Sequence, residues 1–505
     1  MGMVILDNPF GSSNSYILLL FVAGSVLWAF VWHRRKSQEN QESCIVSKAH
    51  LTCDPGDFLA GYNSIVATIS FETRLDPECF FDQFVRTLVS CGPESMWQHR
   101  MIFAGGHMHW QKVDATKWNP RDHLQVHSQP LPEQELESIV SRLITSPVRL
   151  DRPCWDITFF ERVCSDDRVY SVCILKYHHA MADGFTMLRH MLLRSRPVDQ
   201  LNERNSGLDV LPSMTRMQTQ APPYSFGSVI KSLVGVLTQK PDRPSIFRAS
   251  SCRKPQEPLL VAFSDLPTIT VDKLKMIKNA FRKRFGIPFS LNDILVSALT
   301  IAMRNFARLE SGESHIQDAN SVIWVSLPRS EKSNSRELGN GGLGFALCAL
   351  PLSMNTSNIS ETVIETQRRL AALKASPEPA IINIALYLIG LLPVWLGKRI
   401  SALAADKASC SISNMAGPTH KLVWPVPRPE ERTADTSDHG CGVVKSVFFA
   451  TSPPFHYGPL FSLLTYHGNV YVSVSGRAEI FTKDELSKLV KFYLLNAVIE
   501  IEKSL

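Results

Sequence analysis

The sequence lacks the short signatures of several common enzyme classes. Its 505 residues contain no Cys-x-x-Cys pair, no His-Glu-x-x-His stretch and no Gly-x-Ser-x-Gly stretch. These absences argue against a zinc or dithiol redox motif, a zinc-protease helix and the nucleophile elbow of a serine hydrolase. Eleven cysteines are scattered from Cys44 to Cys441, which is typical of reduced thiols that fill a core in a cytosolic setting. We predict no metal site.

A strong net charge is also absent. Lys and Arg number 53 and Asp and Glu 47, so the formal net charge is only +6. This excess is too small to favour nucleic acid as a partner, although it agrees with an anionic ligand or a membrane surface. Hydrophobic residues make up 44% and charged residues 20%, which predicts a globular protein with a true core. The length allows two or three domains.

Long uncharged runs are rare, and the first lies near the N-terminus. Residues 16–32 (YILLLFVAGSVLWAFVW) carry no charge over 17 residues, the short end of a membrane-spanning helix. Residues 1–15 contain no Lys or Arg, whereas the basic stretch 33–36 (HRRK) follows at once. The positive-inside rule then places the rest of the chain in the cytosol. We expect a single-pass anchor, with the endoplasmic reticulum as the membrane; an uncleaved or atypical signal peptide is the alternative.

A second apolar run covers residues 380–400 (AIINIALYLIGLLPVWLGKRI). Asn383 and Pro393 argue against a clean membrane span. The run could instead line a lipid tunnel or lie in the membrane interface. A buried core helix is the remaining alternative.

Two halves of mixed strands and helices follow a polar tether at 33–59. In the half at 60–196, residues 63–73 (NSIVATISFET) alternate as a strand does. Further patterns predict helices over 76–91, 135–145 and 184–195 and paired strands over 155–163 and 168–178. We therefore expect this half to close near residue 196.

The second half follows a crossover linker at 197–257, which holds seven prolines and one apolar helix near SVIKSLVGVL. Within 258–505 the patterns predict strands over 259–266, 321–327, 344–352 and 469–476 and helices over 271–285 and 291–309. Because strands and helices mix in both halves, the predicted class is α/β or α+β in two comparable domains. Gly339, Gly341 and Gly344 spell a G-x-G-x-x-G pattern, but a strand follows where a dinucleotide site needs a helix, so we reject a bound nucleotide cofactor.

The stretch ILKYHHAMADGFTML, residues 174–188, offers the clearest chemistry. Successive side chains of a strand point to opposite faces, so only one of His178 and His179 can face a given cavity, and the other must be buried in its own domain. An imidazole with a pKa of about 6.5 is largely neutral near pH 7 and can accept a proton from a hydroxyl or thiol. Asp183 could cap the following helix or hold the loop through an arginine. Gly184 would permit a close approach of backbones.

HHAMADG resembles the HHxxxDG motif of the acyltransferase superfamily that includes chloramphenicol acetyltransferase. Four ordered blocks narrow the resemblance to the wax ester synthase/diacylglycerol acyltransferase family: RLDRPCWDITFFERV, SLNDILVSALTIAMRNF, ELGNGGLGFALCALPL and CSISNMAGPTHKL. The similarity covers roughly residues 60–490. It implies two chloramphenicol-acetyltransferase-like domains with the active site in a tunnel between them. The extra glycine in LGNGG departs from the pattern, so we expect that block to bend differently from its relatives.

The resemblance also implies a mechanism and partners. His179 would act as the general base that takes a proton from an alcohol, while the oxygen attacks an acyl-CoA thioester. Acyl-CoA would be a co-substrate, with no permanently bound cofactor, and the acceptor a long-chain alcohol or diacylglycerol from the membrane lipid. The product would be wax ester or triacylglycerol.

Four further residues match family blocks near the tunnel, and each has a structural alternative. Asn292 and Asp293 could simply begin a helix, and Ser413 and Asn414 could shape a turn. Two other functions stay open: transfer to an amine, sterol or small alcohol, and lipid binding without catalysis.

Overall fold

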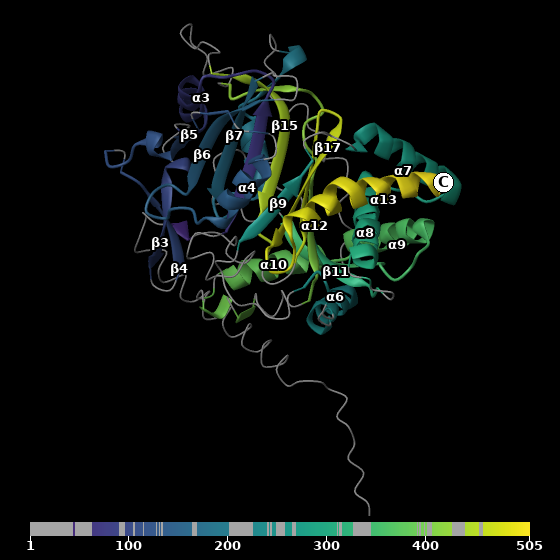
Figure 1. Ribbon diagram of the computed structural model, residues 1–505. Helices are drawn as coiled ribbons and strands as arrows, with labels where there is room; N and C mark the ends of the chain where they lie inside the picture. Colours follow the sequence, from purple (N-terminus) through teal and green to yellow (C-terminus); the bar gives the residue numbers. More distant parts are fainter. Residues whose placement is uncertain are drawn as a thin grey trace, which may run out of the picture.

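The computed structural model describes residues 44–45, 63–89, 96–163, 169–200, 226–248, 258–326, 345–400, 407–426 and 440–505, apart from short gaps inside several of these ranges. Two sheets of seven strands each stand side by side, and a smaller sheet flanks the first (Figure 1). The chain colours in Figure 1 separate the halves: the first sheet is mostly purple and blue, the second teal, green and yellow.

The first sheet has the strand order β5-β6-β7-β2-β15-β14-β8. Its strands are β5 (Leu124–Val126), β6 (Trp155–Val163), β7 (Val169–His178), β2 (Ser64–Phe71), β15 (Gly442–Thr451), β14 (Leu422–Trp424) and β8 (Arg196–Pro197). Every residue of β2 is buried, as is all of β7 after Val169. Both faces of these central strands are therefore covered, which explains their near-continuous apolar sequences.

Helices α3 (Pro77–Phe84), α4 (Leu136–Thr145) and α5 (Gly184–Leu192) belong to the same half. Each presents an apolar stripe at helical spacing, such as Ile139, Val140 and Ile144 in α4. A two-residue strand β1 (Cys44–Ile45) extends the flanking sheet of β4 (His107–Lys112) and β3 (His99–Ala104).

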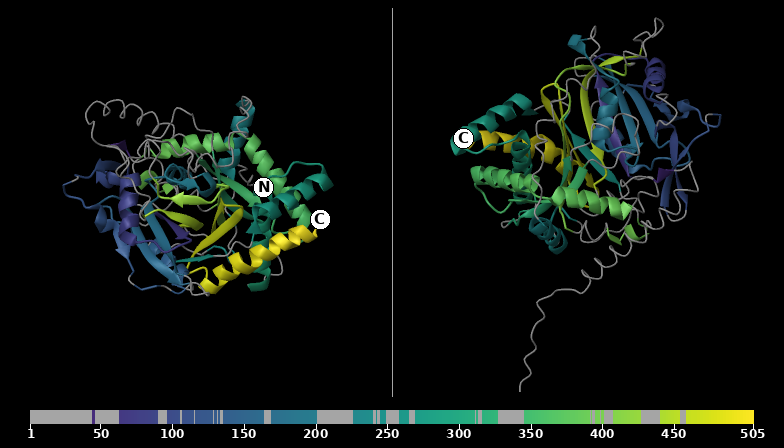
Figure 2. Two further views of the ribbon diagram at one scale, coloured as in Figure 1. Left: turned by 90° about the horizontal axis from the view of Figure 1, so that it is seen from above. Right: turned by 180° about the vertical axis from the view of Figure 1, so that it is seen from behind.

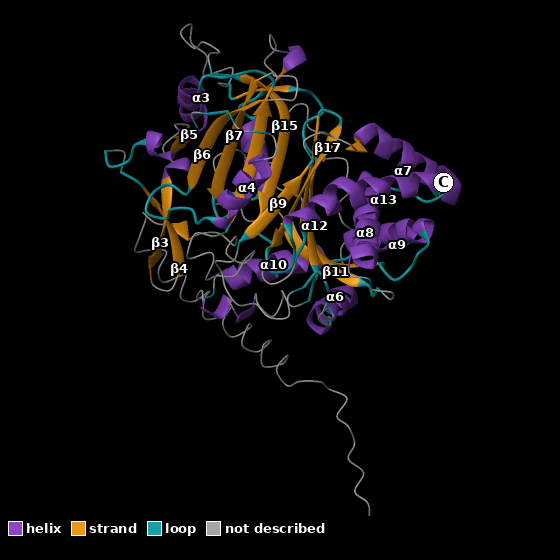
Figure 3. Ribbon diagram, in the orientation of Figure 1, coloured by secondary structure: helices purple, strands orange, loops and turns teal. Residues whose placement is uncertain are grey.

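The second sheet has the order β10-β17-β16-β13-β11-β12, with β9 also paired to β17. Its strands are β10 (Ile269–Thr270), β17 (Asn469–Arg477), β16 (Leu460–Tyr466), β13 (Cys410–Met415), β11 (Ala319–Ser326), β12 (Phe345–Leu352) and β9 (Leu259–Phe263). One face of this sheet shares a core with the helices. These are α7 (Val271–Phe285), α8 (Leu291–Glu310), α9 (Ile359–Ala375), α12 (Lys483–Lys488) and α13 (Leu494–Lys503). In Figure 3 helices α7, α8, α9 and α13 gather on one side of the strands, and the rear view of Figure 2 shows the same layering.

Strand β15 connects the two halves, because it pairs with β2 although it lies late in the sequence. On its other side it pairs with β14 only at Gly442 and Val443, so its remaining length presents an open edge. Hydroxyl groups from β16 and β17 donate hydrogen bonds to carbonyl groups on that edge. Tyr466 Oη donates to the Val444 carbonyl at 2.9 Å, and Ser473 and Ser475 donate to the carbonyls of Phe449 and Thr451 at 2.5 and 2.7 Å.

A second contact between the halves covers the edge strand β9. Ser141 and Thr145 of α4 accept hydrogen bonds from the backbone N–H groups of Val261 and Leu259, both at 2.9 Å. An open strand edge is a template for aggregation, and here helix hydroxyls occupy it.

Most of the predicted elements are confirmed with small shifts in their ends. The linker helix is α6 (Phe226–Thr238). The second apolar run forms α10 (Glu378–Gly390), but it is not a buried core helix. The side chain of Ile384 is 60% exposed, and the other described positions apart from Pro379 are half-buried.

Among the helices that the structure describes, none combines the length and the hydrophobicity that crossing a bilayer requires. The predicted anchor at 16–32, most of the tether and the glycines at 339–344 lie outside the described residues. Those interpretations and the proposed domain boundaries stay predictions.

Replacing Tyr466 by Phe tests the junction at β15. Tyr466 is 2% exposed, and its Oη also accepts from the Leu422 N–H at 3.0 Å. Removing the hydroxyl leaves one buried donor and one buried acceptor unpaired, so we expect the free energy of unfolding to fall by about 1–3 kcal/mol. Chemical denaturation of the full chain measures this; a Tyr466→Phe variant as stable as the wild type would contradict the described junction.

Candidate functional site

The two adjacent histidines have different surroundings because β7 ends between them. His178 is the last residue of the strand and is fully buried. Its backbone N–H donates to the Cys154 carbonyl at 2.8 Å, and its Nδ1 accepts from the Ala180 N–H at 3.1 Å. The prediction that one histidine is held inside its own domain is therefore confirmed for His178.

His179 faces the other half of the molecule. Its backbone N–H donates to the Asn63 carbonyl at 2.8 Å, which fixes the start of the loop. Its ring stacks on Trp324 of β11, with centroids 5.9 Å apart and planes inclined by 22°. The residue is 3% exposed, and within the described part of the chain its Nδ1 has no hydrogen-bond partner. The ring thus lies where the two sheets meet.

The surroundings of His179 favour the neutral imidazole. Burial lowers the pKa of His179 below its usual 6.5, while a contact with its own backbone and the nearby charge of Asp183 act in the opposite direction. A base that is uncharged at neutral pH can accept a proton from a substrate. The side chain therefore has the protonation state that the sequence-based hypothesis requires.

Asp183 and Gly184 shape the turn that follows. Asp183 is 7% exposed and its carboxylate accepts from the Thr186 N–H at 2.6 Å, so it caps α5 as predicted. A Cβ atom at Gly184 would lie 3.0 Å from Sδ of Met415 in β13. The predicted close approach of a backbone at Gly184 is wrong, because the atoms near this position belong to the side chain of Met415. The arginine contact suggested for Asp183 stays a prediction.

Ser413 and Asn414 lie within β13, so the structural alternative that they shape a turn is wrong. They point to opposite faces of the sheet because successive strand residues alternate. Asn414 Nδ2 donates to Asn292 Oδ1 in α8 at 2.9 Å, which places both amides on the helix-covered face. Ser413 shares its face with Met415, which packs against the core of the first half. Of this pair, only Ser413 faces the histidine loop.

Asp293 stabilises the start of α8. Its carboxylate accepts from the Ser290 N–H at 2.6 Å, and its own N–H donates to Ser290 Oγ at 3.2 Å. Burial raises the pKa of this 4%-exposed carboxyl, which the hydrogen bonds to Ser290 partly offset. The structural alternative for Asp293 is therefore the one that the structure supports.

Trp324 was missed as a site residue. The stretch SVIWVSL predicted only a strand, and the contact with His179 joins residues far apart in the sequence. A tryptophan among the aliphatic and serine residues of this stretch was the one available signal.

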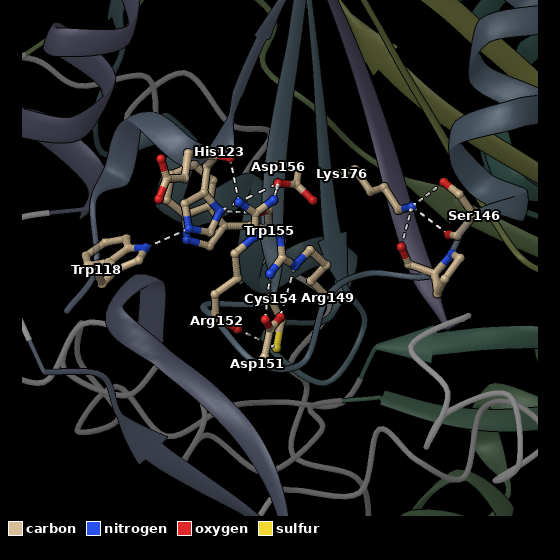
Figure 4. Close-up of polar contacts among 12 residues, drawn as sticks. Trp118, His123, Ser146, Arg149, Asp151, Arg152, Cys154, Trp155, Asp156 and Lys176 are labelled. Carbon is tan, nitrogen blue, oxygen red and sulfur yellow. Dashed lines mark hydrogen bonds and ion pairs between the residues drawn. The ribbon is translucent and has the colours of Figure 1, made fainter.

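A polar network behind the histidine strand was also missed (Figure 4). His123 donates from Nδ1 to the Trp155 carbonyl at 2.5 Å and accepts at Nε2 from Trp118 at 2.7 Å. The bonds imply a neutral ring, and burial lowers the pKa of His123 to about 4. Asp156, whose oxygen lies 3.6 Å from this ring, bonds to Arg152.

This network supports the end of β7. The carbonyl of Cys154 accepts the hydrogen bond from the His178 N–H, and Cys154 lies between Arg152 and Trp155 in the sequence. Asp156 pairs in register with Lys176, two residues before His178. Burial raises the pKa of Asp156 to about 6 despite the opposing charge of Arg152.

Among the residues that the structure describes, no set of three or more His, Cys, Asp or Glu side chains is arranged to hold a metal ion. The chemistry available is that of a neutral imidazole at a junction between two sheets.

Comparisons with known proteins agree with this arrangement. Residues 62–255 match the wax ester synthase/diacylglycerol acyltransferase catalytic domain, and residues 339–425 match the C-terminal domain of the same family. Together they cover more than half of the chain. Wax ester synthase/diacylglycerol acyltransferase 10 of Arabidopsis thaliana is 22% identical over 312 residues, which are 55% of this chain and 59% of that protein. The chain thus spans less than two thirds of this curated relative.

Solved structures share the fold. The wax ester synthase/diacylglycerol acyltransferase from Marinobacter aquaeolei VT8 superposes with a TM-score of 0.56 at 14% identity, over 90% of this chain and 98% of that one. A variant starter condensation domain of rhizomide synthetase, in complex with C8-CoA and Leu-SNAC, gives 0.54 at 12% identity over 91% and 95%. The mixed α/β, two-domain, chloramphenicol-acetyltransferase-like fold is confirmed.

The lowered pKa of His179 predicts the pH dependence of any reaction in which it is the base. Protonation inactivates a base, and a lowered pKa moves that loss to lower pH. We expect kcat/KM to stay level as pH falls to about 6.5, the ordinary imidazole value, and to drop only below it. A pH–rate profile between pH 5 and 8 measures this; an acid limb centred above pH 7 would contradict the buried, neutral ring.

The polar network predicts unequal effects for two neighbouring arginines. Arg152→Ala removes the cation from the mostly buried Asp156, so we expect a loss of about 3 kcal/mol in unfolding free energy. The loss should be larger at pH 8 than at pH 5, because the Asp156 carboxyl, with a pKa of about 6, needs no cation once protonated. Arg149 and Asp151 have side chains 63% and 61% exposed. Arg149→Ala is therefore the matched control, with a change within about 1 kcal/mol.

Urea denaturation at the two pH values compares the variants. Equal losses for both arginines, or no dependence on pH, would show that the network does not support this strand end.

Proposed function

We propose that this chain, which belongs to the wax ester synthase/diacylglycerol acyltransferase family, is an acyl-CoA-dependent O-acyltransferase that forms wax ester or triacylglycerol. The observation that carries the proposal is His179, a buried imidazole with a lowered pKa at the junction of the two sheets. A proton acceptor in that position suits the activation of an alcohol. The names of the related proteins support the substrate classes, fatty alcohol and diacylglycerol.

The reaction needs one base and one pair of substrates. His179 takes the proton of the acceptor hydroxyl as the oxygen attacks the thioester carbonyl carbon. The carbon–oxygen bond forms, the electron pair of the C=O bond moves to oxygen, and its return expels the coenzyme A sulfur. The protonated imidazole then returns a proton to the leaving thiolate, which leaves free coenzyme A and an ester. General-base assistance of this kind contributes about 10²–10⁴-fold.

The partners of the histidine loop support this role by holding the imidazole in place. The His179 N–H is bonded to Asn63, and Asp183 caps the helix that follows. Gly184 allows that helix to start against Met415. Positioning of the reacting groups is itself a large part of catalysis, so these residues are expected to affect rate without contacting substrate.

We further propose that the enzyme draws its acceptor from a membrane, with the catalytic halves on the cytosolic side of the endoplasmic reticulum. Exposed apolar side chains near α6 and α10 support this part of the proposal, since Val234, Ile384 and Trp395 are 50%, 60% and 63% exposed. Helices α6 and α10 contact each other and lie together at one end of the molecule (Figure 1). Large exposed apolar groups in one region are typical of surfaces that meet a membrane or a partner.

The direct test is transfer of labelled palmitoyl-CoA by microsomes that contain the full chain, with hexadecanol and diacylglycerol offered separately. The wild type should form labelled ester. His179→Ala should lose about 10²–10⁴-fold in rate, the contribution of a general base. The exposed His127 gives a matched control, and His127→Ala should keep the wild-type rate.

Each outcome has a distinct meaning. Ester with one acceptor identifies the physiological class of product. Full activity in His179→Ala would contradict the assignment of the base. Thermal stabilisation by acyl-CoA without ester formation, over a panel that adds amines, sterols and small alcohols, would favour lipid binding without catalysis.

A further inference from the structure

The second sheet has one face turned to its helices and the other to the first half. In β16, Phe461 and Leu463 belong to the core shared with the helices, whereas Leu464 and Tyr466 belong to the core of the first half. Because strand residues alternate, Ser462 lies on the face with Leu464 and Tyr466. It therefore points toward the half that carries His179.

A row of small hydroxyl side chains crosses this face. Ser413 of β13 pairs in register with Ser462 of β16, and Ser462 pairs with Ser473 of β17. On the other side of β13 the register with β11 pairs Ile323 with Ile412, so the next residues along, Trp324 and Ser413, are neighbours. The row thus begins beside Trp324, on which the His179 ring stacks.

Ser462 differs from Ser473 in its hydrogen bonds. Ser473 Oγ donates to the Phe449 carbonyl on the open edge of β15 at 2.5 Å. Ser462 lies on β16, the strand from which Tyr466 donates to the Val444 carbonyl of β15. It is 2% exposed, and its Oγ is buried without a hydrogen-bond partner among the described residues. A buried hydroxyl that makes no bond destabilises the folded state, so a ligand that accepts its proton would remove an unfavourable contact.

The spacing between these groups suits a reacting carbonyl. Neighbouring strands lie about 4.8 Å apart, so the backbones at Trp324 and Ser462 are separated by two spacings, roughly 10 Å. The imidazole lies over Trp324 at one end and the free hydroxyl at the other. The attacking oxygen would lie next to the imidazole. The carbonyl carbon and then the carbonyl oxygen would follow it in the direction of Ser462.

We propose that the Ser462 hydroxyl donates a hydrogen bond to the carbonyl oxygen of the bound acyl thioester. The assignment rests on the proposed acyl transfer and adds the group that stabilises its transition state. As the acceptor oxygen bonds to the carbonyl carbon, negative charge develops on the carbonyl oxygen, and Ser462 Oγ–H bonds to that oxygen more strongly. Ser462 forms no covalent bond and keeps its proton. The charge disappears when the C=O bond re-forms and the sulfur leaves.

The first test compares Ser462→Ala with Ser473→Ala. Loss of a donor to a developing oxyanion lowers kcat by about 10²–10³-fold, and we expect a decrease near the lower figure with little change in KM for acyl-CoA. The melting temperature of Ser462→Ala should not fall, because no protein hydrogen bond is lost. Ser473→Ala removes the bond to the Phe449 carbonyl and should show the reverse, a lower melting temperature with a near-normal kcat.

The second test measures binding without turnover. S-(2-oxoheptadecyl)-CoA carries a ketone near the position of the thioester carbonyl, whereas S-hexadecyl-CoA has none. We expect the wild type to bind the ketone about three- to tenfold more tightly, which is the range of one neutral hydrogen bond. Ser462→Ala should bind the two analogues equally, and Ser473→Ala should keep the preference.

The two experiments separate the inference from the proposed function. A ketone preference that depends on Ser462, in a wild type that forms no ester with any acceptor, would support the carbonyl contact and overturn the proposed acceptors. Ester formation with normal kcat in Ser462→Ala, or an unchanged ketone preference in that variant, would overturn the contact and leave the function standing. If neither analogue binds the wild type, both are overturned.

Discussion

The arrangement of the two halves depends on the open edge of β15. This strand comes from the second half of the sequence and pairs with β2 in the first sheet, but β14 covers only its first residues on the other side. Buried carbonyl groups need donors. Serine and tyrosine hydroxyls of β16 and β17 supply them at Val444, Phe449 and Thr451. Separating the halves would leave these acceptors unpaired, so the hydrogen bonds fix the position of one sheet relative to the other.

The position of the histidine loop follows from that junction. Thr451 at the end of β15 pairs with Ile65, next to Ser64, and Ser64 pairs with His178. The loop after β7 therefore begins at the level where the two sheets meet, and His179 reaches Trp324 of the second sheet. Two identical side chains then acquire different roles because β7 ends between them. His178 is held by backbone groups of its own half, whereas His179 stays without a partner at Nδ1 among the described residues.

Local patterns in the sequence predicted the elements well, because helix and strand periodicities depend on near neighbours. The N-cap role of Asp183 and the separation of the two histidines follow from such local rules. The pairing of β14 with β8 and of β15 with β2 does not, since each joins residues that lie hundreds of positions apart. The sequence SISN was compatible with a turn or a strand, and only parallel pairing with β11 and β16 decides for the strand.

Contacts across the junction were equally inaccessible to sequence reasoning. Trp324 and Ser462 each lie in an unremarkable strand pattern, and their relation to His179 exists only after both sheets are assembled. The exposure of α10 has a similar origin. Its sequence is apolar enough for a core helix, but whether a neighbour covers it depends on distant segments.

Hydrogen bonding along the serine row separates structural from functional side chains. Ser473 and Ser475 have carbonyl partners on β15 and contribute to the junction. Ser462 has the same chemistry and burial, but its hydroxyl has no hydrogen-bond partner among the described residues. The nearby imidazole of His179 is buried with an unpaired Nδ1 as well. Folding alone gains nothing from leaving a buried donor and a buried ring nitrogen unpaired on facing surfaces. Their presence on the two sides of the junction, while Ser473 and Ser475 are hydrogen-bonded, is what a site for a polar reacting group requires.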